Sequence, residues 1–191
     1  MKKTLTLAAM LLATNVHANQ ERTFDITPSM GYGWGSADVE MESGIYKAES
    51  DYDIRSPKLG FALEWHNGFV LELTHQRFKD ADNDDTDASK ASMVHIGYMH
   101  TFTEDFKGYA KLGYGVIDSP DFMDDNGNIG ALTFGGRYTI SKPLSLYAEY
   151  QFMHATYEGN ARISNNNANI NIDADLDMDM AMFNVGVAYS F

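Results

Sequence analysis

Apolar and polar residues alternate with a period of two along most of the chain after residue 22. This period is typical of β-strands with one apolar and one polar face, whereas an α-helix repeats every 3.6 residues. We find no convincing helical spacing. The pattern predicts eight strands of about ten residues, the length of a tilted membrane-crossing strand. Their cores lie at 23–34, 58–65, 71–76, 94–102, 109–116, 132–140, 146–152 and 183–191.

The connections between these segments alternate between short and long. The short ones are 66–68, 103–105 and 141–143, and the long ones are roughly 35–55, 79–90, 118–128 and 158–179. Asn67-Gly68 favours a tight turn because both residues tolerate a positive φ. Outer-membrane barrels place short periplasmic turns opposite long outer loops, whereas a soluble sandwich has no reason to sort its loops in this way.

The two strand faces differ sharply in composition. One face is almost purely apolar and aromatic, and the other mixes small residues with charges. In water the apolar face would fill a lipocalin-like barrel; in a membrane it would face lipid, and the polar face would fill a narrow interior. Aromatic residues at strand ends favour the membrane, where they form interfacial girdles. They are Trp34, Trp65, Phe69, Phe102, Phe106, Tyr189 and Phe191. We therefore predict an all-β, eight-stranded, antiparallel, up-and-down transmembrane β-barrel.

The first eighteen residues have the features of a secretory signal peptide. Lys2 and Lys3 precede a short apolar run, and Ala18 is a small residue suited to cleavage. The run is too short to cross a bilayer as a helix. We expect residues 1–18 to be the signal peptide and residues 19–191 to be one barrel domain.

The chain resembles the small eight-stranded outer-membrane barrels, such as the transmembrane domain of outer membrane protein A and the outer membrane protein X/Ail group. The resemblance rests on the signal peptide, the eight strands, the alternating connections and the terminal Tyr189-Ser190-Phe191. It implies location in the outer membrane of a Gram-negative bacterium. It also implies that the terminal strand, with Tyr189 and Phe191, is read by the barrel-assembly machinery. No peptidoglycan-binding domain is expected, because nothing follows Phe191 in this sequence.

Charge and cysteine content narrow the function classes. The absence of cysteine excludes disulfides, thiolate metal sites and cysteine nucleophiles. The net charge of −13 becomes −15 without Lys2 and Lys3, and it argues against nucleic-acid binding. Twenty of the 27 acidic residues lie in the four long connections, so the expected outer surface is acidic. This acidity suits a solvated cap or, alternatively, the capture of divalent cations, alone or bridged to lipopolysaccharide phosphates.

One acidic segment is a weak metal-site candidate. Asp80, Asp82 and Asp84 match the first half of an EF-hand loop, but Asp85 replaces the required glycine and Ala91 the required glutamate. We reject a true EF-hand and keep a weak Ca²⁺ or Mg²⁺ site as a hypothesis. No other cofactor is expected.

Charged residues on the polar face are expected to point into the lumen. They are Glu64, Glu72, Lys111, Arg137 and Glu149. Buried charges are tolerable when paired, so we interpret them as a salt-bridge plug. A gated ion path is the alternative, although eight strands are too few for an open channel.

Methionines share the inward parity near the outer rim. They are Met93, Met153, Met178, Met180 and Met182. They suit packing that caps the barrel or, alternatively, an adaptable surface for hydrophobic ligands. Alternation continues through 170–179, which indicates that the last strand extends above the membrane.

Catalysis is not expected. His75 and Ser92 could lie diagonally on adjacent strands facing lipid, but no acid completes a triad there. We expect a non-enzymatic, monomeric barrel for surface interaction or envelope integrity, in contact with outer-membrane lipid and lipopolysaccharide. The alternatives are a porin-like carrier or pore for small or hydrophobic solutes and a lipid A-modifying enzyme.

Overall fold

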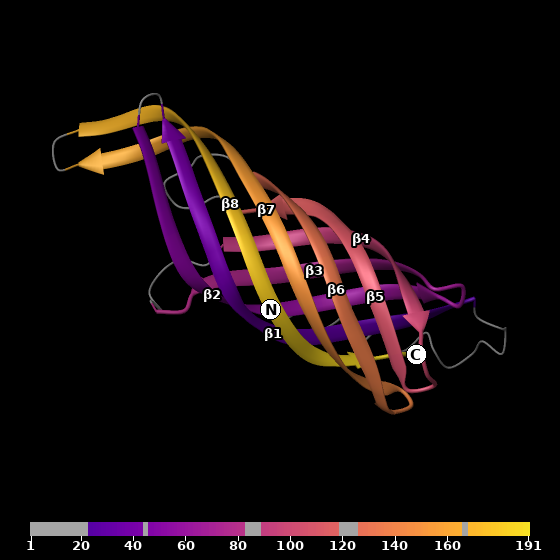
Figure 1. Cartoon of the computed structure of the whole chain (residues 1–191). Helices are drawn as coiled ribbons and strands as arrows, with labels where there is room; N and C mark the ends of the chain where they lie inside the picture. Colours follow the sequence, from indigo (N-terminus) through magenta and orange to yellow (C-terminus); the bar gives the residue numbers. More distant parts are fainter. Residues whose placement is uncertain (1–22, 44–45, 83–88, 119–125, 166–167) are drawn as a thin grey trace, which may run out of the picture.

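Eight antiparallel strands form one closed barrel in the order β1 to β8 (Figure 1). The computed structural model describes residues 23–43, 46–82, 89–118, 126–165 and 168–191. No helix in these ranges is long and apolar enough to cross a membrane. The strands are β1 (Phe24–Ser43), β2 (Tyr46–Trp65), β3 (Phe69–Asp80), β4 (Ser89–Thr101), β5 (Phe106–Ile117), β6 (Gly127–Ser141), β7 (Leu144–Asn165) and β8 (Ala168–Tyr189).

The barrel is strongly staggered. Asp38 on β1 is paired directly with a residue of β8, which is paired in turn with a residue of β7, and so on around the barrel. This path returns to β1 at Pro28, ten residues before Asp38 in the sequence. A stagger of this kind requires strands that are tilted against the barrel axis, and eight tilted strands enclose a narrow interior filled by side chains.

The expected strand lengths and two of the expected loops are wrong. The strands have 12 to 22 residues instead of about ten, because β1 and β2 pair through most of 35–55 and β7 and β8 pair through most of 158–179. Figure 1 shows these two hairpins projecting beyond the other strands. The acidic residues of these segments occupy only one face of the continuing strands. The expected extension of the last strand is confirmed.

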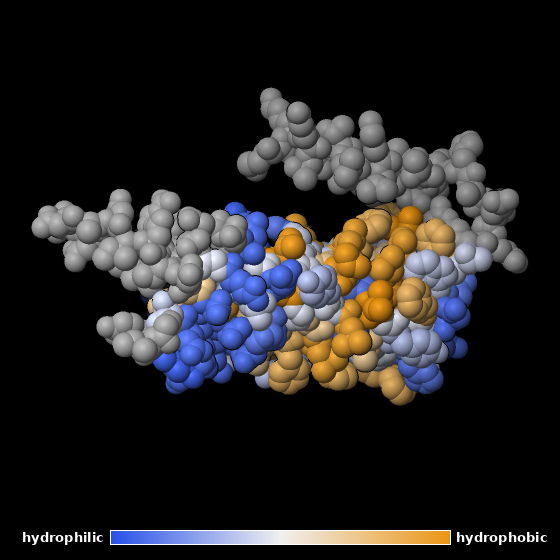
Figure 2. All heavy atoms as spheres, turned by 90° about the horizontal axis from the view of Figure 1, so that it is seen from above, coloured by the Kyte–Doolittle hydropathy of each residue, from blue (hydrophilic) through white to orange (hydrophobic). Residues whose placement is uncertain are grey.

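Hydropathy divides the outer surface along the barrel. Exposed apolar and aromatic side chains form a band across the part of the barrel toward the short turns, the short-turn end itself is again partly hydrophilic, and the projecting hairpins carry a hydrophilic surface (Figure 2). Trp65 packs against Phe24 and Phe69 near one of these turns, with ring centroids 5.9 and 5.2 Å apart. Trp34, expected at a strand end, lies within β1 because that strand continues above it.

Candidate functional site

The lumen near the short turns holds a chain of alternating charges. Lys58 contacts Glu149, Glu149 accepts a hydrogen bond from Lys111 at 3.3 Å, and Lys111 contacts Glu72 at 2.5 Å. All four side chains are buried. They come from β2, β7, β5 and β3, so barrel closure brings together residues up to 91 positions apart.

A second ion pair lies in the same half of the lumen. Both terminal nitrogens of the Arg137 guanidinium contact the Glu64 carboxylate, at 2.7 and 2.8 Å. Of these two contacts, the one from Nη1 to Oε2 is a hydrogen bond, and a charged hydrogen bond of this kind is stronger than a neutral one. The four charged residues described above and this Arg137–Glu64 pair together form the ion-pair network of the lumen. It contains three basic and three acidic side chains, so their formal charges balance.

The structure thus brings all five sequence-predicted interior residues into one region. It adds two participants that the sequence analysis did not assign to the plug. Lys58 is almost completely buried against Glu149, and the Tyr109 hydroxyl donates to Glu149 at 3.0 Å while its ring lies beneath Lys111. The inward parity of Lys58 was a usable signal, whereas the contact of Tyr109 depends on barrel closure.

The opposite half of the lumen is apolar. A buried cluster fills it with side chains from all eight strands. Met182, Ile117 and Ile129 are completely inaccessible to solvent. The five sequence-predicted methionines all contribute to this cluster, with Met178 packed at its partly buried margin.

The outer face of the projecting hairpins carries acidic residues in register. Asp38 is paired directly with Asp51 on β2 and with Asp179 on β8, and Glu40 is paired in the same way with Glu49 and Asp177. Like charges directly opposite one another are destabilising in a sheet. We call the outward-facing acidic side chains of this region the acidic wall. Its members are Asp38, Glu40, Glu42, Glu49, Asp51, Asp53, Glu158, Asp175, Asp177 and Asp179.

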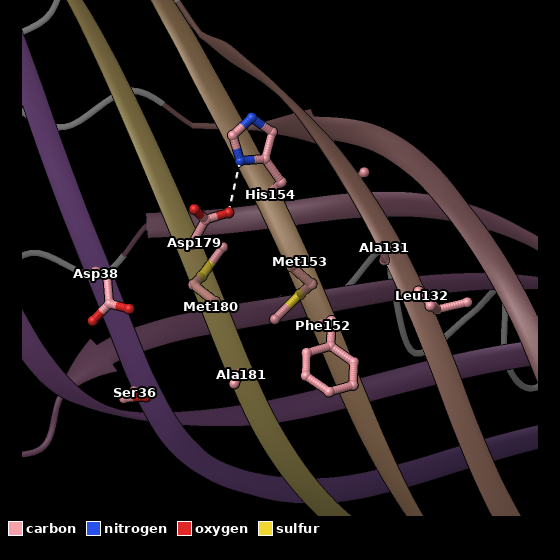
Figure 3. A pocket seen from close by; sticks show the side chains of 11 residues that line it. Ser36, Asp38, Ala131, Leu132, Phe152, Met153, His154, Asp179, Met180 and Ala181 are labelled. Atoms are coloured by element: carbon pink, nitrogen blue, oxygen red, sulfur yellow. Dashed lines mark hydrogen bonds and ion pairs between the residues drawn. The ribbon is translucent and has the colours of Figure 1, made fainter.

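Two basic groups lie within the acidic wall. Lys47 contacts Glu40 and Glu49, and hydrogen bonds to their carboxylates raise the pKa of its ammonium group. His154 contacts Asp179 at 2.8 Å on the exposed face of β7 and β8. Figure 3 shows this pair beside a surface groove of about 450 Å³, with Asp38 on the neighbouring strand and Phe152 and Leu132 below.

His75 and Ser92 face outward on β3 and β4. The diagonal arrangement expected from the sequence is wrong, because the two residues are directly paired. Their Nδ1 and Oγ atoms are 3.0 Å apart.

The weak metal-site candidate lies partly outside the described residues, which end at Asp82 before this gap. Within them, the Asp80 carboxylate accepts a hydrogen bond from the Asp82 amide at 2.8 Å. No group of three or more potential ligands suited to a metal ion occurs in the described part of the chain. The hypothesis of a weak site involving Asp84 therefore stays a prediction, as does the signal peptide at residues 1–18.

The terminal aromatic residues lie together at the short-turn end. The rings of Tyr189 and Phe191 are 4.7 Å apart, and the Phe191 amide donates to the Ile26 carbonyl at 3.0 Å. Recognition of these residues by the assembly machinery remains an expectation.

A closed eight-stranded barrel with an apolar outer surface and a charged lumen is the architecture of a membrane-spanning barrel. The sequence model of the family described as "Outer membrane protein beta-barrel domain" matches residues 4–191. The chain belongs to this family. A search of the curated proteins gave no match. This outer membrane barrel therefore resides in the bacterial outer membrane, with its short turns on the periplasmic side.

Solved structures support the same fold. OprG from Pseudomonas aeruginosa has a TM-score of 0.57 and 13% identity, covering 89% of this chain and 97% of OprG. AlkL, solved in lipid bilayers, has a TM-score of 0.56 and 12% identity, covering 92% of this chain and 94% of AlkL. OprH from P. aeruginosa has a TM-score of 0.50 and 14% identity, covering 86% of this chain and 99% of OprH. At such identities the similarity establishes the fold of this outer membrane barrel and leaves its activity open.

Proposed function

We propose that this protein is a non-conducting, non-enzymatic outer-membrane barrel that acts at the cell surface through its acidic wall. The observation that carries the proposal is the division of the molecule. The lumen is filled by a balanced ion-pair network and an apolar cluster, while unbalanced charge is concentrated on the projecting hairpins. A filled lumen supports the plug interpretation over an ion path.

The acidic wall suits contact with cationic groups. Its directly opposed carboxylates repel one another, and this repulsion is relieved when a cation or a basic surface binds. Divalent cations could link the wall to neighbouring lipopolysaccharide phosphates and so support envelope integrity. Basic surfaces of other molecules would be attracted by the same field.

A deletion strain tests this proposal. We expect loss of the protein to raise sensitivity to detergent and chelator or to reduce attachment to host cells, and these readouts separate integrity from adhesion. Complementation with Asp38→Asn and Asp179→Asn combined should fail, whereas a matched barrel with Glu104→Gln and Asp105→Asn at a periplasmic turn should restore the phenotype. Full rescue by the first variant would contradict a role for the acidic wall.

Two further measurements test the negative parts of the proposal. The purified barrel in planar bilayers should show no steady large-conductance openings, and such openings would contradict the plug. Mass spectrometry of lipid A from expressing cells should show unchanged acylation, and an acyl chain lost or gained would establish an enzyme.

Transport of apolar solutes is the second candidate, and the apolar half of the lumen favours it. Val39 and Met178 lie partly exposed at its margin, and Tyr52 on the neighbouring strand is exposed. Saturable uptake of an apolar fluorescent probe that Met178→Asp abolishes would support a carrier. Uptake that is unaffected by Met178→Asp would argue against a carrier function.

A further inference from the structure

A basic surface lies on the outer face of β2, β3 and β4, near their extracellular ends. Arg55 is paired directly with Lys79, and Arg77 is paired directly with Lys90. Four of the chain's 14 basic residues therefore meet on three adjacent strands. We call these four residues the basic patch. As in the acidic wall, direct pairing of like charges is unfavourable for the isolated sheet, so an anion bound between the pairs would relieve the repulsion.

The basic patch is only partly neutralised by the protein. Lys90 contacts Asp118 at 3.5 Å, and both side chains are about half exposed. Within the described residues, Arg77 and Lys79 have no carboxylate partner. Arginine is well suited to phosphate because its planar guanidinium can donate two parallel hydrogen bonds.

Two polar side chains lie immediately below the basic patch. His75 and Ser92 are the next outward-facing residues after Arg77 and Lys90 on the same two strands, and they are hydrogen-bonded to each other. Both are exposed. They therefore form a polar layer between the basic patch and the membrane interior.

An apolar groove lies below this polar layer. It has a volume of about 420 Å³ and lies against His75 and Ser92. Leu59, Leu73 and Val94 line it with strongly exposed side chains, and Phe61 contributes from β2. These residues face lipid, so the groove is open to an acyl chain.

We propose that the basic patch, the His75–Ser92 pair and the groove together bind one phosphorylated lipid of the outer leaflet. The vertical order on the barrel wall is cationic, polar and apolar. It matches the order of phosphate, linkage region and acyl chain in such a lipid. The basic patch holds the phosphate, His75 and Ser92 contact the linkage region, and the groove receives one chain. This site lies on a different strand set from most of the acidic wall and goes beyond the proposed surface function.

The geometry favours binding without hydrolysis. The nearest outward-facing neighbours of His75 within the described strands are Leu59, Leu73, Arg77 and Ser92, so no carboxylate orients the imidazole. Backbone N–H groups in paired strands are also committed to the sheet, which leaves no preorganised pair to stabilise an oxyanion. The Ser–His contact therefore serves recognition.

Lipid binding can be measured with the full barrel refolded in phosphatidylcholine vesicles. The probe is purified bisphosphorylated lipid A, titrated by tryptophan fluorescence and checked by native mass spectrometry. We expect Arg77→Ala with Lys90→Ala to weaken binding at least tenfold. Lys107→Ala with Lys142→Ala removes the same charge at the periplasmic end and should change binding less than twofold. Heat-dependent migration on gels verifies that each variant is folded.

Two further arms separate a lipid site from a simple anion site. Leu73→Ser should weaken lipid A binding several-fold without removing any charge, and inorganic phosphate should not compete at equal concentration. Asp118→Asn should strengthen binding two- to threefold because it frees Lys90. Equal binding by the Arg77/Lys90 variant, or equal losses in the periplasmic control, would overturn the site. Competition by inorganic phosphate would show an anion site that does not select a lipid.

If the Arg77/Lys90 double variant fails to fold, Arg77→Gln alone keeps the proposal testable and should weaken binding at least threefold. If the barrel does not bind lipid A at this site, the detergent, chelator and attachment phenotypes expected from the acidic wall are still testable. Those phenotypes are measured with variants that retain the basic patch. The two proposals can therefore fail separately.

Discussion

The two halves of the lumen fill the same narrow space in opposite ways. The periplasmic half uses six charged side chains in direct contact, and the extracellular half uses methionine, isoleucine and alanine. A buried charge is stable only while its partner remains, whereas an apolar side chain loses transfer and packing energy in proportion to what is removed. The halves should therefore respond differently to single substitutions, although both close the barrel.

The largest effect is expected from Glu149→Ala. This carboxylate contacts both Lys58 and Lys111, so its removal leaves two buried ammonium groups with less compensation. Breaking a buried pair typically costs 3–5 kcal/mol. The free energy of unfolding, measured by urea titration in lipid vesicles with tryptophan fluorescence, should fall by about this amount.

Glu158→Ala is the matched control on the same strand. Glu158 faces outward and is exposed, so its removal should cost less than about 1 kcal/mol. A similar loss in both variants would show that the interior network is not tightly coupled.

A smaller effect is expected from Met182→Ala in the apolar half. Met182 is completely buried, and truncating a buried methionine costs about 2–5 kcal/mol through lost burial and the remaining cavity. Unfolding titrations in the same vesicles measure this loss. Met30→Ala provides the comparison, because Met30 is 57% exposed and faces lipid. If Met182→Ala is as harmless as Met30→Ala, the extracellular half is loosely packed.

The smallest effect is expected when a pair is removed together. Lys58→Met combined with Glu149→Leu removes one charge of each sign and leaves Lys111 with Glu72 and Arg137 with Glu64. Replacing a buried ion pair with apolar residues is often neutral, so the double variant should lie within about 1 kcal/mol of the unsubstituted barrel. A double variant less stable than Glu149→Ala would mean that the pair itself supplies net stability.

Glycines opposite long side chains explain how six charges fit in the periplasmic half. A Cβ added at Gly135 would lie 2.5 Å from the ring of Tyr109, whose hydroxyl donates a hydrogen bond to Glu149. The sequence shows a glycine at an inward position but does not indicate which side chain occupies the space. This information arises only when β5 and β6 are paired in register.

Alternation in the sequence predicted the strands well where one face is apolar and the other small or polar, but the strand assignment was not correct everywhere. It was wrong in 35–55, which was assigned to a long connection although acidic residues alternate with apolar ones there. Alternation was the better indicator there, since Val39 and Met41 face inward while Asp38 and Glu40 face outward. Likewise, His75 and Ser92 were placed on the correct strands and faces, but a shift of two residues in register separates a diagonal from a direct pair.

The sequence by itself determined the closed all-β fold, the direction of each strand face and the inward position of the charged residues, because the period of two is a local property of the backbone. Only the tertiary structure decided which residues meet. The stagger of the barrel places Lys58 against Glu149, aligns Asp38 with Asp51 and Asp179, and aligns Arg77 with Lys90. Such pairings depend on register between strands distant in sequence, and no local pattern encodes that register.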